Sequence, residues 1–216
     1  MHELLPQHAR SQSLREEIAN AISHGIGLIA VFAASPFLII SAVRKGSTWA
    51  IVGSCVFAAT MALLYLTSTL YHAFPAGRAK GIFRVLDHEA IYFLIAGTYT
   101  PFTLGVLHGP WGWTLLGLVW GLAVFGVTMK ATGSMRCVRL STGLYVAMGW
   151  LIIIAIRPLW STMPLPGLLW LLGGGIAYTG GVAFFVAERV RYSHMVWHFF
   201  VIAGTTCHFL AVLWYA

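Results

Sequence analysis

Charged side chains are scarce in this sequence. Asp, Glu, Lys and Arg make up only 9% of its 216 residues, against about 25% in soluble domains. The hydrophobic fraction is 59% and the mean hydropathy is +0.82. This composition excludes an ordinary soluble domain and indicates an integral membrane protein.

Cysteine is also rare. Cys55, Cys137 and Cys207 are far apart in apolar or near-membrane sequence. They form no CxxC pair and their number is odd, which argues against a disulfide framework. We therefore expect buried, unreactive thiols.

Acidic residues are scarcer still. There are 6 Asp and Glu against 13 Lys and Arg, which gives a formal net charge of +7. In a soluble protein this excess would suggest a nucleic-acid partner, but in a membrane protein it reports orientation and contact with anionic lipid. We expect membrane lipids as partners and no nucleic acid.

Apolar runs of spanning length recur seven times, at 20–43, 49–72, 88–107, 111–129, 140–156, 165–187 and 195–215. Each is close to the roughly 20 residues that cross the hydrocarbon of a bilayer. The links between them, such as "RKGS", "HGP" and "RPLWSTMP", are short, so sequential helices are predicted to be antiparallel neighbours. The predicted architecture is an all-α integral membrane protein with a cytoplasmic tail at 1–15 and a seven-helix transmembrane domain at 16–216.

The distribution of Lys and Arg predicts the orientation of these helices. One set of flanks holds Arg10, Arg15, Arg78, Lys80, Arg84, Lys130, Arg136, Arg139, Arg189 and Arg191. The other set holds Arg44, Lys45 and Arg157. The positive-inside rule therefore predicts a cytoplasmic N-terminus and an outside C-terminus for a multi-pass protein of the plasma (inner) membrane.

Small residues and prolines suggest how the helices pack. Gly117 and Gly121 form one pair at helix-packing spacing, and Gly173, Ala177 and Gly181 form a longer stripe. Such stripes let helices approach closely. Pro36 and Pro101 are expected to kink the first and third helices.

Unusual polar residues gather at the predicted cytoplasmic ends of several helices. His72 ends the second run, and Ser68 lies one turn earlier on the same face. Asp87 opens the third run, and His194 and His198 open the seventh in "RYSHMVWHFF".

The first run opens with a further polar group. In "EEIANAISHG", Glu17, Asn20 and His24 share one helical face. All 6 acidic residues lie on the predicted cytoplasmic side, whereas the outer half has only His108 and His208 as histidines.

These positions predict a metal site near the cytoplasmic face. His194 and His198 are one turn apart, and histidines at this spacing can ligate the same ion. His72 is the best third ligand because it lies at the same predicted depth. Three histidine nitrogens plus water form a catalytic zinc arrangement, in which Asp87 is placed to accept a hydrogen bond from that water and Ser68 to support the site.

Each residue also has a simpler interpretation. Histidines at a membrane interface often meet only water and headgroups. Asp87 can cap its helix, and Ser68 can bond back to its own helix. Glu17, Asn20 and His24 either take part in the site or tie the first helix to cytoplasmic loops. Structural roles are assigned to His88, Glu89, His108 and His208.

The full combination resembles a known family. The motifs are "ExxNxxxH" (Glu17, Asn20, His24), "SxxxH" (Ser68, His72), Asp87 and "HxxxH" (His194, His198). Together they are similar to the haemolysin III branch of the progestin and adipoQ receptor family, from residue 15 to the C-terminus.

The resemblance implies seven transmembrane helices, a cytoplasmic N-terminus and kinship with alkaline ceramidases in a superfamily proposed to be metal-dependent membrane hydrolases. In adiponectin receptors, the histidines that match His72, His194 and His198 hold zinc. The residue matching Asp87 contacts the zinc water, and the residue matching Ser68 lies beside it. The short tail resembles that of prokaryotic members, so no protein hormone is expected as a partner.

Three functions follow as hypotheses. The first is zinc-dependent hydrolysis of a membrane lipid amide or ester, with Asp87 as general base and Ser68 at the oxyanion or the water. The second is a non-enzymatic protein with structural or regulatory zinc that tunes membrane composition or energetics, which a fourth protein ligand such as His24 or Asp87 would favour. The third is a pore or cytolytic protein, and the acid-free outer half argues against it.

Overall fold

The computed structural model describes residues 11–132, 137–187 and 189–216, and within these ranges all regular structure is helical. The elements are α1 (Leu14–Arg44), α2 (Thr48–Ala73), α3 (Arg78–Pro101), the π-helix η1 (Phe102–Val106), α4 (Pro110–Ala131), α5 (Val138–Gly149), the 3₁₀-helix η2 (Leu151–Ala155), α6 (Ile156–Thr162), α7 (Leu165–Phe185) and α8 (Ser193–Tyr215). The all-α prediction is confirmed over these residues.

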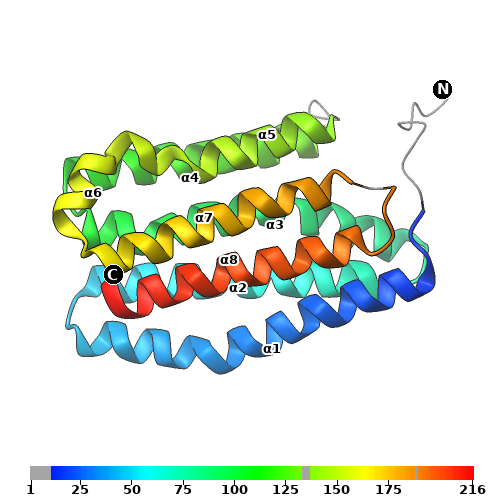
Figure 1. Ribbon diagram of the computed structural model, residues 1–216, viewed down its shortest axis with the longest axis horizontal. Helices are drawn as coiled ribbons and strands as arrows, with labels where there is room; N and C mark the ends of the chain where they lie inside the picture. The colour runs from blue at the N-terminus through cyan, green and yellow to red at the C-terminus, as the bar shows by residue number, and fades with distance from the viewer. Residues whose placement is uncertain (1–10, 133–136, 188) are drawn as a thin grey trace.

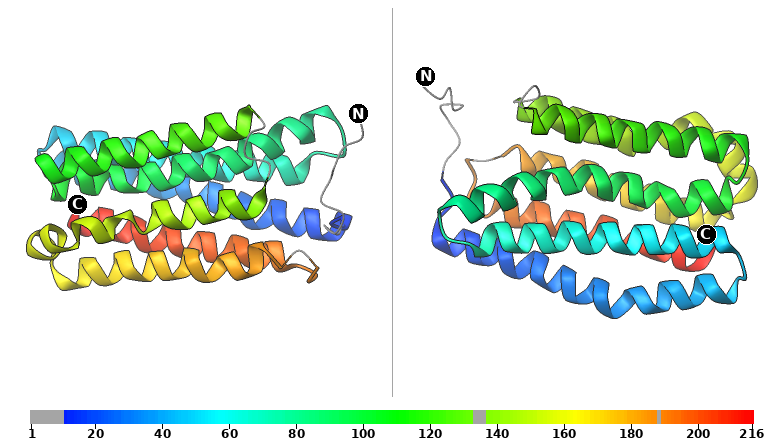
Figure 2. Two further views of the ribbon diagram at one scale, coloured as in Figure 1. Left: turned by 90° about the horizontal axis from the view of Figure 1, so that it is seen from above. Right: turned by 180° about the vertical axis from the view of Figure 1, so that it is seen from behind.

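The helices form an elongated bundle whose long members run along one axis (Figure 1). α2 packs between α1 and α3, α8 packs against α7 and α1, and α4 packs against α3. The short links make neighbours antiparallel, as expected (Figure 2). The beginnings of α1, α3 and α8 and the end of α2 therefore lie at the same end of the bundle.

Six helical segments of the described residues are long and apolar enough to cross a membrane: α1, α2, α4, the rod Leu140–Thr162, α7 and α8. The chain is thus a multi-pass membrane protein. The run expected at 88–107 is the later part of α3 together with η1, and α3 is not among the six. The reason is that its first turns carry Arg78, Lys80, Arg84, Asp87 and Glu89.

The fifth expected span, 140–156, is longer than predicted. It consists of α5, the tight 3₁₀ segment η2 and α6, which together reach Thr162. Most of the expected link "RPLWSTMP" is therefore helical. Pro158 is compatible with this because it stands in the first turn of α6, where a missing N–H breaks no internal hydrogen bond.

The two prolines behave differently. α1 continues through Pro36 for 31 residues, roughly 46 Å, and bends along its length (Figure 1). At Pro101 the α-helix ends and the π-helix η1 follows, so the backbone ladder changes there.

The start of α1 is well defined. Ser13 is its N-cap and forms a capping box with Glu16, and residues 1–10 of the expected tail lie outside the described residues.

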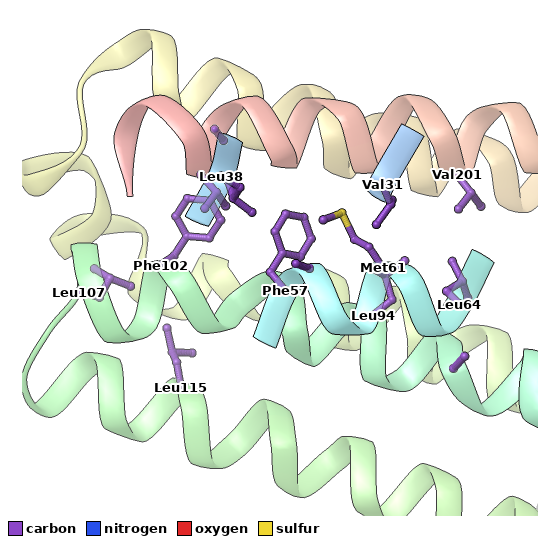
Figure 3. Close-up of a cluster of buried hydrophobic side chains, with 14 of the residues drawn as sticks. Val31, Leu38, Phe57, Met61, Leu64, Leu94, Phe102, Leu107, Leu115 and Val201 are labelled. Atoms are coloured by element: carbon purple, nitrogen blue, oxygen red, sulfur yellow. The ribbon is translucent and has the colours of Figure 1, made fainter. Parts of the chain in front are cut away.

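Apolar side chains cover the outside of the bundle as well as its core. The outer face of α1 carries Ile18, Ile22, Ile26, Ile29, Phe32, Phe37 and Ile40, all of them exposed. Contiguous apolar surface of this kind suits contact with lipid. Inside, the core includes Phe57, Met61 and Leu64 of α2, which meet Val31 of α1 and Leu94 of α3 (Figure 3).

The three cysteines form no disulfide. Cys55 and Cys137 are exposed, so the expectation that all three thiols are buried is wrong, and Cys207 is half-buried. Cys55 lies on an outward face of α2, where a thiol can face lipid as readily as a core.

The expected close approach at Gly117 and Gly121 is also wrong, because a Cβ at either position would meet nothing within 4 Å. α4 meets its neighbour on another face. A Cβ at Gly126 would lie 2.4 Å from the ring of Tyr92. In α7, Gly181 does accept close packing, since its Cβ would lie 2.7 Å from Phe200.

Candidate metal centre

The end of α2 and the start of α8 bring three histidines together. His72, His194 and His198 each offer a ring nitrogen, and these nitrogens all lie within 4.8 Å of one another. The ring centroids are 5.1 Å apart for His72 and His194, 5.2 Å for His72 and His198, and 4.7 Å for His194 and His198. The ligand set predicted from the sequence is therefore one spatial cluster.

The first turn of α1 helps to place α8. Tyr192, directly before α8, has a left-handed backbone with φ 59°. Its N–H donates to Oε1 of Glu16 at 3.0 Å. This bond ties the start of α8, and with it His194 and His198, to the start of α1.

His72 is held by a carboxylate. Its Nδ1 lies 2.7 Å from Oε2 of Glu17, and Lys80 lies 3.0 Å from the other oxygen of that carboxylate. Because a carboxylate accepts, the proton of His72 is on Nδ1. Nε2 then carries the lone pair, and it is buried with no protein partner.

His198 is oriented in the same sense by α1. Its Nδ1 lies 2.8 Å from Oγ of Ser23, whose own hydroxyl donates to the carbonyl of Asn20 at 2.8 Å. Ser23 can therefore only accept from His198, so Nδ1 carries the proton and Nε2 the lone pair. A histidine whose Nδ1–H is bonded in this way presents Nε2 to a metal ion.

Ser68 connects α1 to Asp87. Its Oγ lies 2.7 Å from Nδ1 of His24, and its hydroxyl also interacts with the Asp87 carboxylate. Because an ionised carboxylate cannot donate, Ser68 donates to Asp87 and accepts from His24. Asp87 lies more than two turns inside α3, so the alternative that it caps that helix is not supported.

The donor set fits zinc. Imidazole nitrogens are common zinc ligands, and a set of three protein ligands leaves the fourth coordination position of zinc open. Among the described residues, Nε2 of His72 is buried without a hydrogen-bond partner, as is Nε2 of His24, and an ion in the cluster would give the His72 nitrogen a partner. The described metal-ligating cluster includes neither His24 nor Asp87, the fourth ligands considered from the sequence.

The remaining polar residues divide into two groups. Asn20 is buried beside the site, and its Nδ2 donates to Gln12 at 2.6 Å. His108 and His208 contact backbone carbonyls, of Leu104 and Leu171. These two contacts agree with the structural roles assigned to them.

A cavity of about 490 Å³ opens beside the histidines. Ser68, Asp87, His194 and His198 line it at one end, and it extends along α8 as far as His208. That stretch of α8 is roughly 21 Å long. Mostly apolar side chains of α3, α5, α6 and α7 form the remaining wall, and the size is typical of a site for a small molecule or a lipid chain.

Two contributors to the site were missed from the sequence. Ser23 lies three residues after Asn20 and therefore on the same side of α1 as that residue, and this spacing was the available signal. Lys80 was counted only as a charge that sets orientation. No signal in the sequence pointed to Lys80, because its contact with Glu17 depends on how α3 begins.

The comparisons with known proteins agree on one family. The family model described as haemolysin-III related matches residues 12–209. Hemolysin-3 of Bacillus cereus is 47% identical over 205 residues, covering 95% of this chain and 94% of that protein. The Hemolysin-3 homolog of Bacillus subtilis (strain 168) is 46% identical over 203 residues, covering 94% and 95%.

A more distant relative is the human monocyte to macrophage differentiation factor. It is 23% identical over 203 residues, covering 91% of this chain and 83% of that protein. No solved structure matches the chain.

Proposed function

The chain belongs to the haemolysin-III-related family, and from this premise and the histidine cluster we propose that it is a zinc-dependent hydrolase of a membrane lipid amide or ester. The observation that carries the proposal is the position of the cluster: His72, His194 and His198 each offer a nitrogen within 4.8 Å of the others, and two of them, His194 and His198, line an apolar cavity that Asp87 and Ser68 also line. A metal site alone would suit a structural ion, whereas a metal site that adjoins a lipid-sized cavity suits chemistry on a lipid.

We also propose how the site lies in the membrane. α3 and η1 together form one further crossing, which makes seven in all. The N-terminus is cytoplasmic, the C-terminus is outside, and the metal centre lies near the cytoplasmic face of the plasma membrane. Supporting this are Lys and Arg residues in the first turns of α1 and α3, helices that begin at the end of the bundle that holds the histidines: Arg15, Arg78, Lys80 and Arg84. The partners are membrane lipids, and neither a protein hormone nor a nucleic acid is involved.

The roles of the residues follow from their positions. His72, His194 and His198 hold the zinc ion. Bound zinc supplies Lewis acidity, which polarises a carbonyl and makes water a better nucleophile. Asp87 accepts a proton from the attacking water as general base and returns it to the leaving group. Ser68 interacts with the Asp87 carboxylate and orients it.

The cavity defines the class of substrate. Its largely apolar wall accepts an acyl chain, and its polar end accepts the carbonyl that joins this chain to a headgroup. A lipid with an amide or ester near the bilayer surface would place that carbonyl at the depth of the histidines.

The experiment compares lipid hydrolysis by the wild type, Asp87→Asn and a zinc-stripped sample, each reconstituted with mixed ceramide-like lipids and glycerolipids. Asp87→Asn removes the base but keeps the shape of the side chain. Release of free fatty acid, measured by mass spectrometry, should fall by about 10²–10⁴-fold while zinc stays bound. Glu89→Gln, a neighbouring acid of α3 that does not line the cavity, is the matched control and should retain activity.

The competing function is a non-enzymatic membrane protein with structural zinc. In that case the wild type releases no fatty acid above the zinc-stripped control, and Asp87→Asn changes thermal stability only modestly. The relatives carry the name Hemolysin-3, but the mostly apolar wall of the cavity does not favour a pore.

A further inference from the structure

α1 supplies no ligand to the histidine cluster, yet it turns a row of buried polar groups towards it. Asn20 is 1% exposed, and Ser23 and His24 are 3% exposed. Burying polar groups within a membrane-spanning helix costs free energy, so their presence indicates that they interact with specific partners.

The first contact is between Glu17 and His72. The carboxylate of Glu17 is 19% exposed and holds Nδ1 of a histidine side chain that is 0% exposed. Lys80 of α3 pairs with the same carboxylate at 3.0 Å and keeps it in place. Glu17 thus fixes both the ring orientation and the proton of His72.

The second contact is between Ser23 and His198. The 2.8 Å bond is fully buried and spans 175 residues of sequence, so it is a feature of the folded bundle. The carbonyl of Asn20 accepts the Ser23 hydroxyl, which leaves Ser23 to serve as an acceptor for His198. The backbone of Asn20 also lies within reach of His198.

The third contact leads to the base. His24 bonds to Ser68 at 2.7 Å, and Ser68 lines the cavity together with Asp87 and interacts with its carboxylate. The ring of His24 also stacks on that of His198, with centroids 3.5 Å apart and planes at 12°. One side chain of α1 therefore supports a histidine ligand and the carboxylate at once.

We propose that α1 is the positioning element of the metal centre, in which Glu17 orients His72, Ser23 orients His198 and His24 orients Asp87 through Ser68. The inference rests on the proposed function, because it requires His72 and His198 to ligate an ion. It assigns a role to the motif in "EEIANAISHG", and it adds Ser23 to that motif. A ligand whose Nδ1–H is fixed presents Nε2 in the correct tautomer before the metal arrives.

The test uses full-length protein with Glu17→Ala, Glu17→Gln and Ser23→Ala. Ser35→Ala is the matched control, since Ser35 lies on the same helix and, among the described residues, its hydroxyl bonds only to the Val31 carbonyl. Zinc affinity, measured by chelator competition, should fall by about 10–100-fold in Glu17→Ala and Ser23→Ala. Glu17→Gln should restore part of it, because an amide oxygen still accepts from His72. Ser35→Ala should leave it unchanged.

Two spectroscopic measurements separate positioning from general stability. The visible spectrum of the cobalt-substituted protein should change in Glu17→Ala and Ser23→Ala but not in Ser35→Ala. In metal-free protein with ¹⁵N-labelled histidine, His72 should be the Nδ1–H tautomer and should lose that preference in Glu17→Ala.

The outcomes are distinguishable. Zinc-loaded wild type together with unchanged affinity, spectra and tautomer in the Glu17 and Ser23 variants would overturn this inference alone. A wild type that binds no zinc would overturn the proposed metal centre and the inference with it.

Discussion

Hydrogen-bond direction at single residues determines what the histidine cluster can do. Glu17 can only accept, and Ser23 has already donated its proton to the Asn20 carbonyl. His72 and His198 must therefore carry their protons on Nδ1 and present Nε2. Motif spacing brings such rings together, but the proton positions depend on partners from α1, which spacing along α2 and α8 does not reveal.

Single glycines also determine where two helices can pack closely. A Cβ at Gly97 would lie 2.0 Å from Oγ1 of Thr60, whereas a Cβ at Gly117 would meet nothing within 4 Å. Gly97→Ala should destabilise the protein by about 1–3 kcal/mol, because α2 and α3 would have to separate. Gly117→Ala should be neutral or stabilising by up to about 1 kcal/mol, since alanine favours a helix.

Thermal unfolding of both variants in detergent measures this difference. The packing described for α3 and α4 would be contradicted if Gly117→Ala were the more damaging change.

At the scale of elements, α3 is the exception in the bundle. It lies between α2 and α4 and supplies Asp87. Because its first turns are charged, it is not among the segments whose composition is apolar enough to span a membrane. Charges at one end of a helix are compatible with spanning when they reach the interface. The apolar part of α3 continues through η1 to Val106, so the helical path is longer than α3 alone.

The number of crossings has a direct consequence for the chain ends. With α3 as a seventh crossing, the two ends of the chain lie on opposite sides of the membrane, and the proposed orientation puts the N-terminus in the cytoplasm. With six crossings, both ends share one side. Paired reporter fusions at each terminus, one active only in the cytoplasm and one only outside, should give opposite results for the two ends. Cytoplasmic signals from both fusions would contradict the seventh crossing.

At the scale of the whole molecule, much of the arrangement was predictable from hydropathy and spacing. The antiparallel neighbours followed from the short links. The cluster of His72, His194 and His198 and the closeness of Asp87 and Ser68 followed from helix ends at one depth. Two features did not follow. Gly117 and Gly121 face outwards because a small-residue pair does not say which face meets a neighbour. The helix through Arg157–Thr162 was hidden because Pro158 also suits a link.

The cavity could not be predicted from the sequence either. Its wall is built by α3, α5, α6, α7 and α8 together, and apolar side chains that line a cavity look the same in sequence as those that face lipid. Only the placement of the helices distinguishes them. The substrate class proposed here therefore depends on the structure, while the ligand set depends mainly on the sequence.

The most direct test of the account is the metal content of purified protein. The wild type should hold about one zinc per chain, and His194→Ala or His198→Ala should strongly reduce it. His208→Ala should retain it, because His208 lies several turns further along α8 and contacts the Leu171 carbonyl. Equal zinc content in the wild type, His194→Ala and His198→Ala would contradict the metal centre.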